Sequence, residues 1–325
     1  MPEKHMDRCT IILVVYDRND SYSQEHALPA AVDSLLAIAV NQEVILVNNQ
    51  DLASCPRTSA YLRHLAAVHP EIRLVETDRN TGCAGGFNAG YRVARKDSDF
   101  YVYMSGDALV VQPDMLQRIV IGFERYPKAG LLHPLSIYED IDLFNVDEGF
   151  SANAFFAKAS YEEETATRDA PLVSGEIAGL CDRVSGRPAS LRWPAMQVPL
   201  TFLAIRRAVF EKVGLFDDGF LAGGENIDFT LRALQAGFRA GCLENSFVFH
   251  RRLLFRQLGS AGKNREVETA GQTTFNDHWK QKWGALRPID VYRQARYGKV
   301  VFFCVIRPAV WLMQYIRTGL FKVRG

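Results

Sequence analysis

The chain has 325 residues, enough for one large domain or two smaller ones with a sizeable core. Its composition, 48% hydrophobic and 23% charged, is that of an ordinary globular protein, and a formal net charge of +1 gives no reason to expect nucleic acid as a partner. The six cysteines are scattered without metal-ligand spacing, and no apolar leader precedes the first predicted strand. We therefore expect a cytoplasmic protein with reduced thiols rather than a disulfide framework.

Strand and helix patterns alternate over the first 130 residues. Short apolar runs, rich in β-branched residues, predict buried strands at 10–16, 43–49, 72–77 and 99–107. Helical spacing of apolar residues predicts helices at 27–39, 58–69, 85–96 and 112–127. This alternation predicts an α/β fold, a doubly wound and mainly parallel sheet with helices on both faces.

Polar residues follow each of the four predicted strands. Sheets of this kind bind ligands at the carboxyl ends of their strands, so four polar clusters at one edge predict a binding site. The clusters are Asp17-Arg18-Asn19, Asn48-Asn49, Asp78-Arg79-Asn80 and Ser105-Gly106-Asp107.

The alternation fades between residues 131 and 196. This stretch is acidic and without clear periodicity, and we expect an irregular insertion or loop region beside the site. Order resumes with a strand and a short helix before Gly214, a helix closed by Gly237, and a strand that ends at His250.

A glycine-rich segment, DRNTGCAGGFNAGYRVA, runs from Asp78 to Ala94 and opens a helix. Backbone N–H groups at such a helix start can hold a phosphate. The spacing is not that of the dinucleotide fingerprint, and the segment follows the third strand rather than the first. A tight turn with close helix packing explains the glycines equally well.

Two further residues end predicted strands. Asp107 could hold a divalent cation that bridges a diphosphate, although an aspartate in a turn is the commoner case. His250 precedes two arginines, and a lone histidine is more often structural than a ligand.

The stretch GGENIDFTLR places Glu225 and Asp228 at the start of a helix. A carboxylate presented there could accept a proton from a neutral hydroxyl. The alternative is that Asp228 pairs with Arg232 one turn later and that both acids favour the helix dipole.

The order of these motifs is more specific than any one of them. It is carried by VVYDRND, VILVNNQD, NTGCAGGFNAGYRVA, YMSGDALVVQPDML, AIRRAVFEKVGLFDDGF, GENIDFTLRALQAGF, FVFH and FNDHWKQKWG. On these segments, from about residue 10 to 284, the chain resembles the family 2 glycosyltransferases, which have the GT-A fold. Within that family it is most similar to the bacterial group that includes rhamnosyltransferases.

The resemblance implies a nucleotide-sugar donor and a Mg²⁺ or Mn²⁺ cofactor. It implies Asp107, the one acid retained in the metal-binding DXD-type segment, and His250 as the metal ligands. Asn48 stands where the family usually has an aspartate that contacts the base. The donor-binding residues implied in this way are Tyr16, Arg18, Asn48, Asn80, Gly82, Asn88 and Asp107.

The catalytic base departs from the family pattern. Inverting members usually have an aspartate directly after the glutamate, but this chain has Asn226, whose amide cannot accept the proton. Glu225 and Asp228 remain as catalytic candidates on one helix face, with Glu225 as the base and Asp228 orienting Arg232 or an acceptor hydroxyl. The GGEN sequence also resembles the retaining polypeptide N-acetylgalactosaminyltransferases, so the stereochemical outcome stays open.

The implied function is that of a glycosyltransferase in the hexosyltransferase class, EC 2.4. It would move a sugar to a hydroxyl of a growing cell-surface glycan or a polyprenyl-linked acceptor, with inversion as the leading expectation. The alternative is a catalytically inactive GT-A domain that binds or scaffolds partners in glycan assembly. Asn226 and the single acid at Asp107 support that alternative.

The sequence predicts a glycosyltransferase domain at 1–290 and a basic, apolar tail at 291–325. Between residues 300 and 316 only Arg307 is charged, and Pro308 interrupts a stretch that is short for a spanning helix. Basic borders favour peripheral contact with an anionic membrane, at the inner face of the cytoplasmic membrane, over a core helix that covers the sheet.

Overall fold

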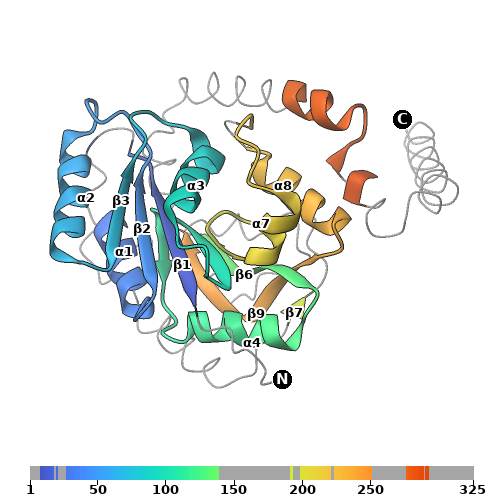
Figure 1. Cartoon of the computed structure of the whole chain (residues 1–325), viewed down its shortest axis with the longest axis horizontal. Coiled ribbons are helices and arrows are strands. Elements are labelled where there is room, and N and C mark those ends of the chain that lie inside the picture. Colours follow the sequence, from blue (N-terminus) through green and yellow to red (C-terminus); the bar gives the residue numbers. More distant parts are fainter. Residues whose placement is uncertain are drawn as a thin grey trace, which may run out of the picture.

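The computed structural model describes residues 8–17, 20, 27–138, 191–192, 198–220, 223–250, 276–288 and 290–292. Within these ranges the chain forms one nine-stranded sheet with helices on both faces (Figure 1). The strand order is β3-β2-β1-β4-β8-β6-β9-β5, and β7 pairs with β9. The predicted α/β architecture is therefore confirmed.

The strands are β1 (Cys9–Val15), β2 (Glu43–Asn48), β3 (Ile72–Glu76), β4 (Phe100–Ser105), β5 (Ala108–Val110), β6 (Ala129–Tyr138), β7 (Leu191–Arg192), β8 (Phe202–Arg206) and β9 (Arg239–His250). The helices are α1 (Ala27–Ile38), α2 (Pro56–Val68), α3 (Gly82–Val93), α4 (Met115–Arg125), α7 (Arg207–Val213) and α8 (Glu225–Gln235).

The first four strands in the order are parallel neighbours, so their carboxyl ends meet at one edge. Val15 of β1 lies opposite Asn48 of β2, and Val14 lies opposite Ser105 of β4. Beyond β4 the sheet becomes mixed, because β8 runs antiparallel to both β4 and β6. The carboxyl ends of β1, β2, β3 and β4, where polar clusters were predicted, therefore lie at one edge of the sheet.

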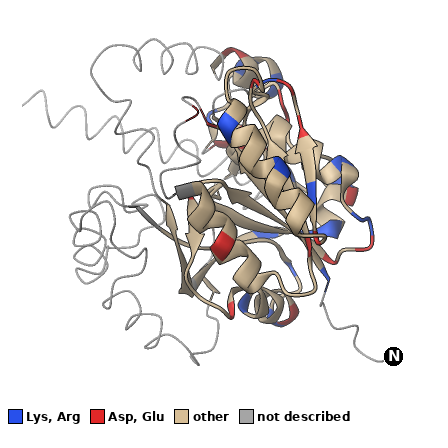
Figure 2. Cartoon of the chain, turned by 90° about the vertical axis from the view of Figure 1, so that its left-hand side faces the viewer, with Lys and Arg blue, Asp and Glu red and all other residues tan. Residues whose placement is uncertain are grey.

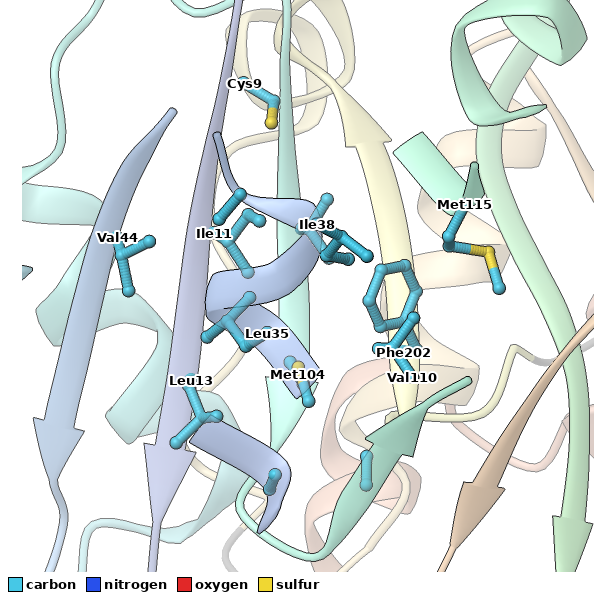
Figure 3. Close-up of a cluster of buried hydrophobic side chains, with 14 of the residues drawn as sticks. Cys9, Ile11, Leu13, Leu35, Ile38, Val44, Met104, Val110, Met115 and Phe202 are labelled. Carbon is cyan, nitrogen blue, oxygen red and sulfur yellow. The ribbon is translucent and has the colours of Figure 1, made fainter. Parts of the chain in front are cut away.

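Alternate residues of each strand face opposite sides of the sheet, and each side has its own core. Ile11 and Leu13 face α1, α2 and α4, whereas Ile12 and Val14 face α3, α7 and α8. Figure 3 shows the first core, where Leu35 of α1 lies beside Ile11 and Leu13 of β1. Each fully buried aliphatic side chain of this kind stabilises the fold by about 1.5–3 kcal/mol.

Charged residues lie mostly outside these two cores. Figure 2 shows that Lys, Arg, Asp and Glu lie mainly on helices and in loops, while the strands are largely uncharged. Buried strands therefore read as continuous apolar runs, as the sequence patterns indicated.

Helix α2 shows how local sequence fixes a helix start. Pro56 occupies its first turn, where a missing N–H costs nothing. The backbone N–H groups of Arg57 and Thr58 donate to the Asp20 carboxylate at 3.0 and 2.8 Å. A carboxylate from the loop after β1 thus caps α2 and ties it to the edge of the sheet.

Strand β6 corrects the expectation that irregular structure begins at residue 131. It pairs in parallel with β9 and antiparallel with β8, near the middle of the sheet. Pro134 lies inside it, and proline is rare in a central strand, which is why the sequence pattern hid the strand. A register shift between Pro134 and Leu135 accommodates the ring. Most of the expected insertion, 139–190 and 193–196, lies outside the described residues.

A smaller core joins the last described segment to α8. It contains Phe220, Leu231, Trp279, Val291 and Tyr292, all buried. Of the predicted tail, residues 293–325 lie outside the described residues, and the membrane expectation lies there with them. In the described part of the chain, no helix combines the length and the apolar character needed to cross a membrane.

Candidate active site

Two residues predicted as metal ligands come together at the edge of the sheet. Asp107 follows β4 directly, and His250 ends β9, where it lies opposite Ala108 of β5. The Nε2 atom of His250 lies 3.2 Å from Oδ2 of Asp107, and both side chains are largely buried. The β5–β9 pairing explains how residues 143 positions apart in the sequence (250 minus 107) meet.

Neighbouring hydroxyl groups hold this pair in place. The Ser105 hydroxyl donates to Oδ1 of Asp107, and the Thr201 hydroxyl lies 3.4 Å from Nδ1 of His250. Burial raises the pKa of Asp107, but the charge of His250 and the hydrogen bonds from His250 and Ser105 outweigh it, so the net shift is downward. The Asp107 carboxylate is therefore ionised, as a cation ligand must be, and a bound cation would take the place of the His250 proton, because imidazole binds a metal only in its neutral form.

A carboxylate suits Mn²⁺ and Mg²⁺, and an imidazole is a common metal ligand in proteins. The part of the chain that the structure describes contains no group of three or more His, Cys, Asp or Glu residues placed to hold a metal. Two protein ligands are still enough for a cation that completes its shell with phosphate oxygens and water. Asp107 and His250 thus fit the implied metal.

Glu225 is the second feature of the site. It begins α8, directly after Gly224, whose backbone φ of 99° is a left-handed conformation that favours glycine. The side chain is only 6% exposed, and Oε2 has no hydrogen-bond partner among the described residues. Burial raises the pKa of Glu225, and hydrogen bonds from the backbone N–H groups of Glu225 and Gly223 offset this only in part.

The raised pKa of Glu225 gives a stability prediction. Between the ordinary value of 4.5 and the raised value, the unfolded carboxyl ionises while the folded one stays protonated, so the free energy of unfolding falls as the pH rises through this window. Glu225→Gln has no such ionisation. We expect the variant to melt at a higher temperature than the wild type near neutral pH and at the same temperature below pH 4.5. Thermal unfolding from pH 4 to 8 measures this, and a variant that is less stable at neutral pH would contradict it.

Asn226 has a structural contact that explains its amide. Its Nδ2 donates to the backbone carbonyl of Val198 at 2.8 Å. A carboxylate at this position has no proton to donate and would face that carbonyl oxygen. The amide therefore connects the start of α8 to the segment before β8.

Asp228 is fully buried and surrounded by donors. Arg232 donates from Nε to Oδ2 at 2.8 Å, as the i,i+4 alternative expected. Lys282 lies 2.8 Å from Oδ1, and the indole Nε1 of Trp283 donates to the same oxygen at 2.9 Å. These contacts join α8 to the helical segment 276–283. They favour Glu225 over Asp228 as the proton acceptor.

Asn49, for which no role was predicted, organises the glycine-rich turn. Its Oδ1 accepts from the Thr81 backbone N–H at 3.0 Å, and its Nδ2 donates to the Gly82 carbonyl at 2.9 Å. Asn80 accepts from the Gly82 N–H at 2.9 Å, and Gly82 itself has a φ of 71°. The signal was present in the sequence as the second asparagine of the Asn48-Asn49 pair.

Two of the following glycines serve packing. A Cβ on Gly86 would lie 2.6 Å from a methyl group of Val14, and one on Gly90 would lie 2.5 Å from a methyl group of Ile12. Helix α3 therefore lies directly on β1, as the packing alternative expected. Close packing and a phosphate-binding helix start are compatible, because they use different parts of the same segment.

The remaining predicted donor residues differ in their surroundings. Tyr16, just after β1, is 42% exposed at the same edge. Asn48 is buried and donates to Ser59 at 3.0 Å. Asn88 is buried and both donates to and accepts from the backbone of Phe216. Arg18 lies outside the described residues.

Cys83 and Tyr103 are neighbours of the site that the sequence analysis did not identify. The Cys83 thiol and the Tyr103 hydroxyl are close enough for each to shift the pKa of the other. Glu225 and Asp107 are both close enough to raise the pKa of each group. The two carboxylates therefore belong to one region, with the Cys83–Tyr103 pair beside both. No spacing in the sequence relates positions 83 and 103.

Residues 10–169 match the model of the glycosyl transferase family 2. This match confirms the resemblance to the family over the part of the chain that holds the glycine-rich turn and Asp107. It does not extend to the rhamnosyltransferase group. No curated protein matches the chain.

Solved structures give the fold. A mannosyltransferase from Pyrobaculum calidifontis, PcManGT, in complex with GDP-Man and Mn²⁺, is 16% identical with a TM-score of 0.50, over 97% of this chain and 83% of that one. GalNAc-T7 with UDP, GalNAc and Mn²⁺ is 12% identical with a TM-score of 0.50, over 77% of this chain and 44% of that one. Identities this low show the fold alone, and the chain has the GT-A fold of glycosyltransferases.

Proposed function

We propose that the chain is a metal-dependent glycosyltransferase that moves a sugar from a nucleotide-diphosphate donor to a hydroxyl of an acceptor. The observation that carries this proposal is the pairing of Asp107 with His250 at the edge of the sheet, in one region with buried Glu225. The family match and the fold support the same class of enzyme.

The donor diphosphate would lie at the carboxyl ends of β1, β2 and β4. Asp107 and His250 would hold Mn²⁺ or Mg²⁺, which when bound would stabilise negative charge on the leaving diphosphate. The backbone N–H groups at the start of α3 offer a second contact for phosphate oxygens. Tyr16, Arg18 and Asn48 remain proposed contacts to the nucleotide. Mn²⁺ in the related structures is consistent with this arrangement.

Glu225 would act as the base. Its pKa is shifted upward, toward the range in which a carboxylate accepts a proton near neutral pH. In an inverting reaction, the acceptor oxygen bonds to the anomeric carbon as the bond to the diphosphate breaks, and the hydroxyl proton passes to Oε2 of Glu225. We propose inversion and an acceptor on a growing cell-surface glycan or a polyprenyl lipid. The basic, apolar tail predicted from the sequence at 291–325 supports a lipid-borne acceptor.

The metal assignment predicts the effect of one substitution. Asp107→Asn should remove the Mn²⁺-dependent part of nucleoside diphosphate binding, because a neutral amide is a much weaker cation ligand. The matched control is Asp97→Asn, which changes a carboxylate that is 58% exposed and pairs with Arg8. Calorimetric titrations with and without Mn²⁺ measure the difference. Binding by Asp107→Asn that still depends on Mn²⁺ as in the wild type would reject the assignment.

The inactive alternative draws its support from Asn226, and the structure gives that residue another role. Its amide bonds the Val198 carbonyl, so it is a fitted contact rather than the remnant of a base. Transfer activity that appears only in Asn226→Asp would nevertheless favour the alternative, because that change supplies the family's usual base at the cost of this hydrogen bond.

A further inference from the structure

The first turns of α3 and α8 are directed to the same region by aromatic packing. Phe216 contacts Phe87 of α3 with ring centroids 5.3 Å apart, and it stacks on Phe229 of α8 at 4.1 Å. Cys83 lies four residues before Phe87, and Glu225 lies four residues before Phe229. Each is therefore on the same helix face as its aromatic partner, one turn nearer the N-terminus.

Tyr103 connects this pair of helices to β4. Its ring contacts Phe87 at 5.7 Å, and Phe87 lies one helical turn after Cys83 on α3. From Tyr103 the strand continues for two residues and then turns into Asp107. The aromatic contacts and the strand direction thus place Cys83 between the base candidate, Glu225, and the metal ligand candidate, Asp107.

Cys83 is exposed, although nearby protein atoms partly desolvate its thiol. Burial, then the negative charge of Glu225, and more weakly that of Asp107, raise the pKa of Cys83 to about 12. The thiol therefore stays neutral at physiological pH. Glu225, which is more than nine-tenths buried, has an Oε2 without a hydrogen-bond partner in the described part of the chain. The exposed, neutral Cys83 side chain lies near the proposed base, Glu225, and the proposed metal ligand, Asp107. It is therefore in a position to contact a small molecule bound between them.

We propose that Cys83 contacts the sugar ring of the donor and contributes to its selection, with Tyr103 as a positioning residue. This proposal rests on the proposed function. The anomeric carbon is bonded to the diphosphate and is attacked by the hydroxyl that Glu225 deprotonates, so the sugar must lie between the metal ligands and the base. The neutral thiol is a weak donor and acceptor and offers no charge to pair with a charged group on the sugar. The sugar is therefore expected to be uncharged.

The test compares nucleotide sugars with the matching nucleoside diphosphates. UDP, GDP and dTDP, and UDP-glucose, GDP-mannose and dTDP-glucose, are titrated in Mn²⁺ against the wild type, Cys83→Leu and a control. The control is Val93→Leu, which adds bulk at an exposed position at the other end of α3. Cys83→Leu should weaken binding of the nucleotide sugar by about tenfold or more, equivalent to 1.4 kcal/mol, and leave diphosphate binding unchanged. Val93→Leu should change neither.

The outcomes distinguish a failure of the proposed role of Cys83 from a failure of the proposed function. Equal loss of sugar and diphosphate binding, or no loss of either, would overturn the role of Cys83 and leave the proposed function intact. A wild type that binds none of the nucleotide sugars would contradict the proposed function itself. If Cys83→Leu lowers the folded fraction, the smaller Cys83→Val replaces it, and a loss confined to the nucleotide sugar is again the expected result.

Discussion

Glu225→Gln is expected to reduce sugar transfer by about 10²–10⁴-fold, the range of general-base catalysis, while donor affinity stays unchanged. The amide keeps the size and much of the hydrogen bonding of the carboxyl group but accepts no proton. Oε2 of Glu225 has no other partner among the described residues, so its replacement disturbs no hydrogen bond to it that the structure shows. The loss should therefore appear in kcat rather than in donor binding.

Glu211→Gln is the matched control, because Glu211 of α7 is 62% exposed and pairs only at the surface with Arg207. It should retain full activity. Full activity in Glu225→Gln would show that Glu225 is not the base and would leave Asp228 as the remaining candidate. The stability measurement between pH 4 and 8 is independent of turnover and shows whether the environment of Glu225 is as described.

Asp228→Asn is expected to destabilise the fold by about 3 kcal/mol, because it leaves the guanidinium of Arg232 without its anion and removes one of the two carboxylates that Lys282 contacts, Asp217 being the other. Arg232 and Lys282 both contact the Asp228 carboxylate, and both are less than one-third exposed. The contact between α8 and segment 276–283 should weaken with it. Urea denaturation monitored by the fluorescence of Trp279 and Trp283 measures the free energy of unfolding.

Glu211→Gln serves again as the control and should change the free energy of unfolding by less than about 0.5 kcal/mol, as is usual for an exposed pair. An Asp228→Asn variant that is as stable as the wild type would show that the buried ion pairs contribute little net stability. In that case Asp228 would become a candidate for the catalytic base.

The first half of the fold was predictable because three of its strands, β1, β2 and β4, are buried on both faces. Their apolar runs, such as that of β1, stand out from the polar clusters at their ends. Parallel pairing then brings those ends together without further information. The prediction that Asp107 lies at the site edge depended on this rule alone.

The later strands were harder to predict for a physical reason. Strand β6 contains His133 and Pro134, and only its pairing with β9 and a shift in register make a proline acceptable there. Strand β5 has three residues, too few for a periodic signal. Pairing between β5 and β9 is nevertheless what brings His250 to Asp107. The sequence could name both residues through the family resemblance but could not show this contact.

Residues with reactive side chains could be proposed as site residues from the sequence, whereas the residues that contact those side chains could not. Glu225 and Asp228 have the same charge and nearly the same place on α8. Only tertiary contacts separate them, because Lys282 and Trp283 reach Asp228 from more than 50 positions away. Asn226 was conspicuous as a departure from the family, but its partner, the Val198 carbonyl, leaves no trace in the sequence.

Release of nucleoside diphosphate from nucleotide sugars in the presence of Mn²⁺ tests the central claim most directly. Water replaces the acceptor in this assay, so the rate is low but requires no knowledge of the acceptor. The account predicts that the wild type releases diphosphate from at least one of UDP-glucose, GDP-mannose and dTDP-glucose, and that Asp107→Asn does not. A wild type that binds a nucleotide sugar, yet releases diphosphate no faster than Asp107→Asn, would contradict the account and indicate an inactive GT-A domain.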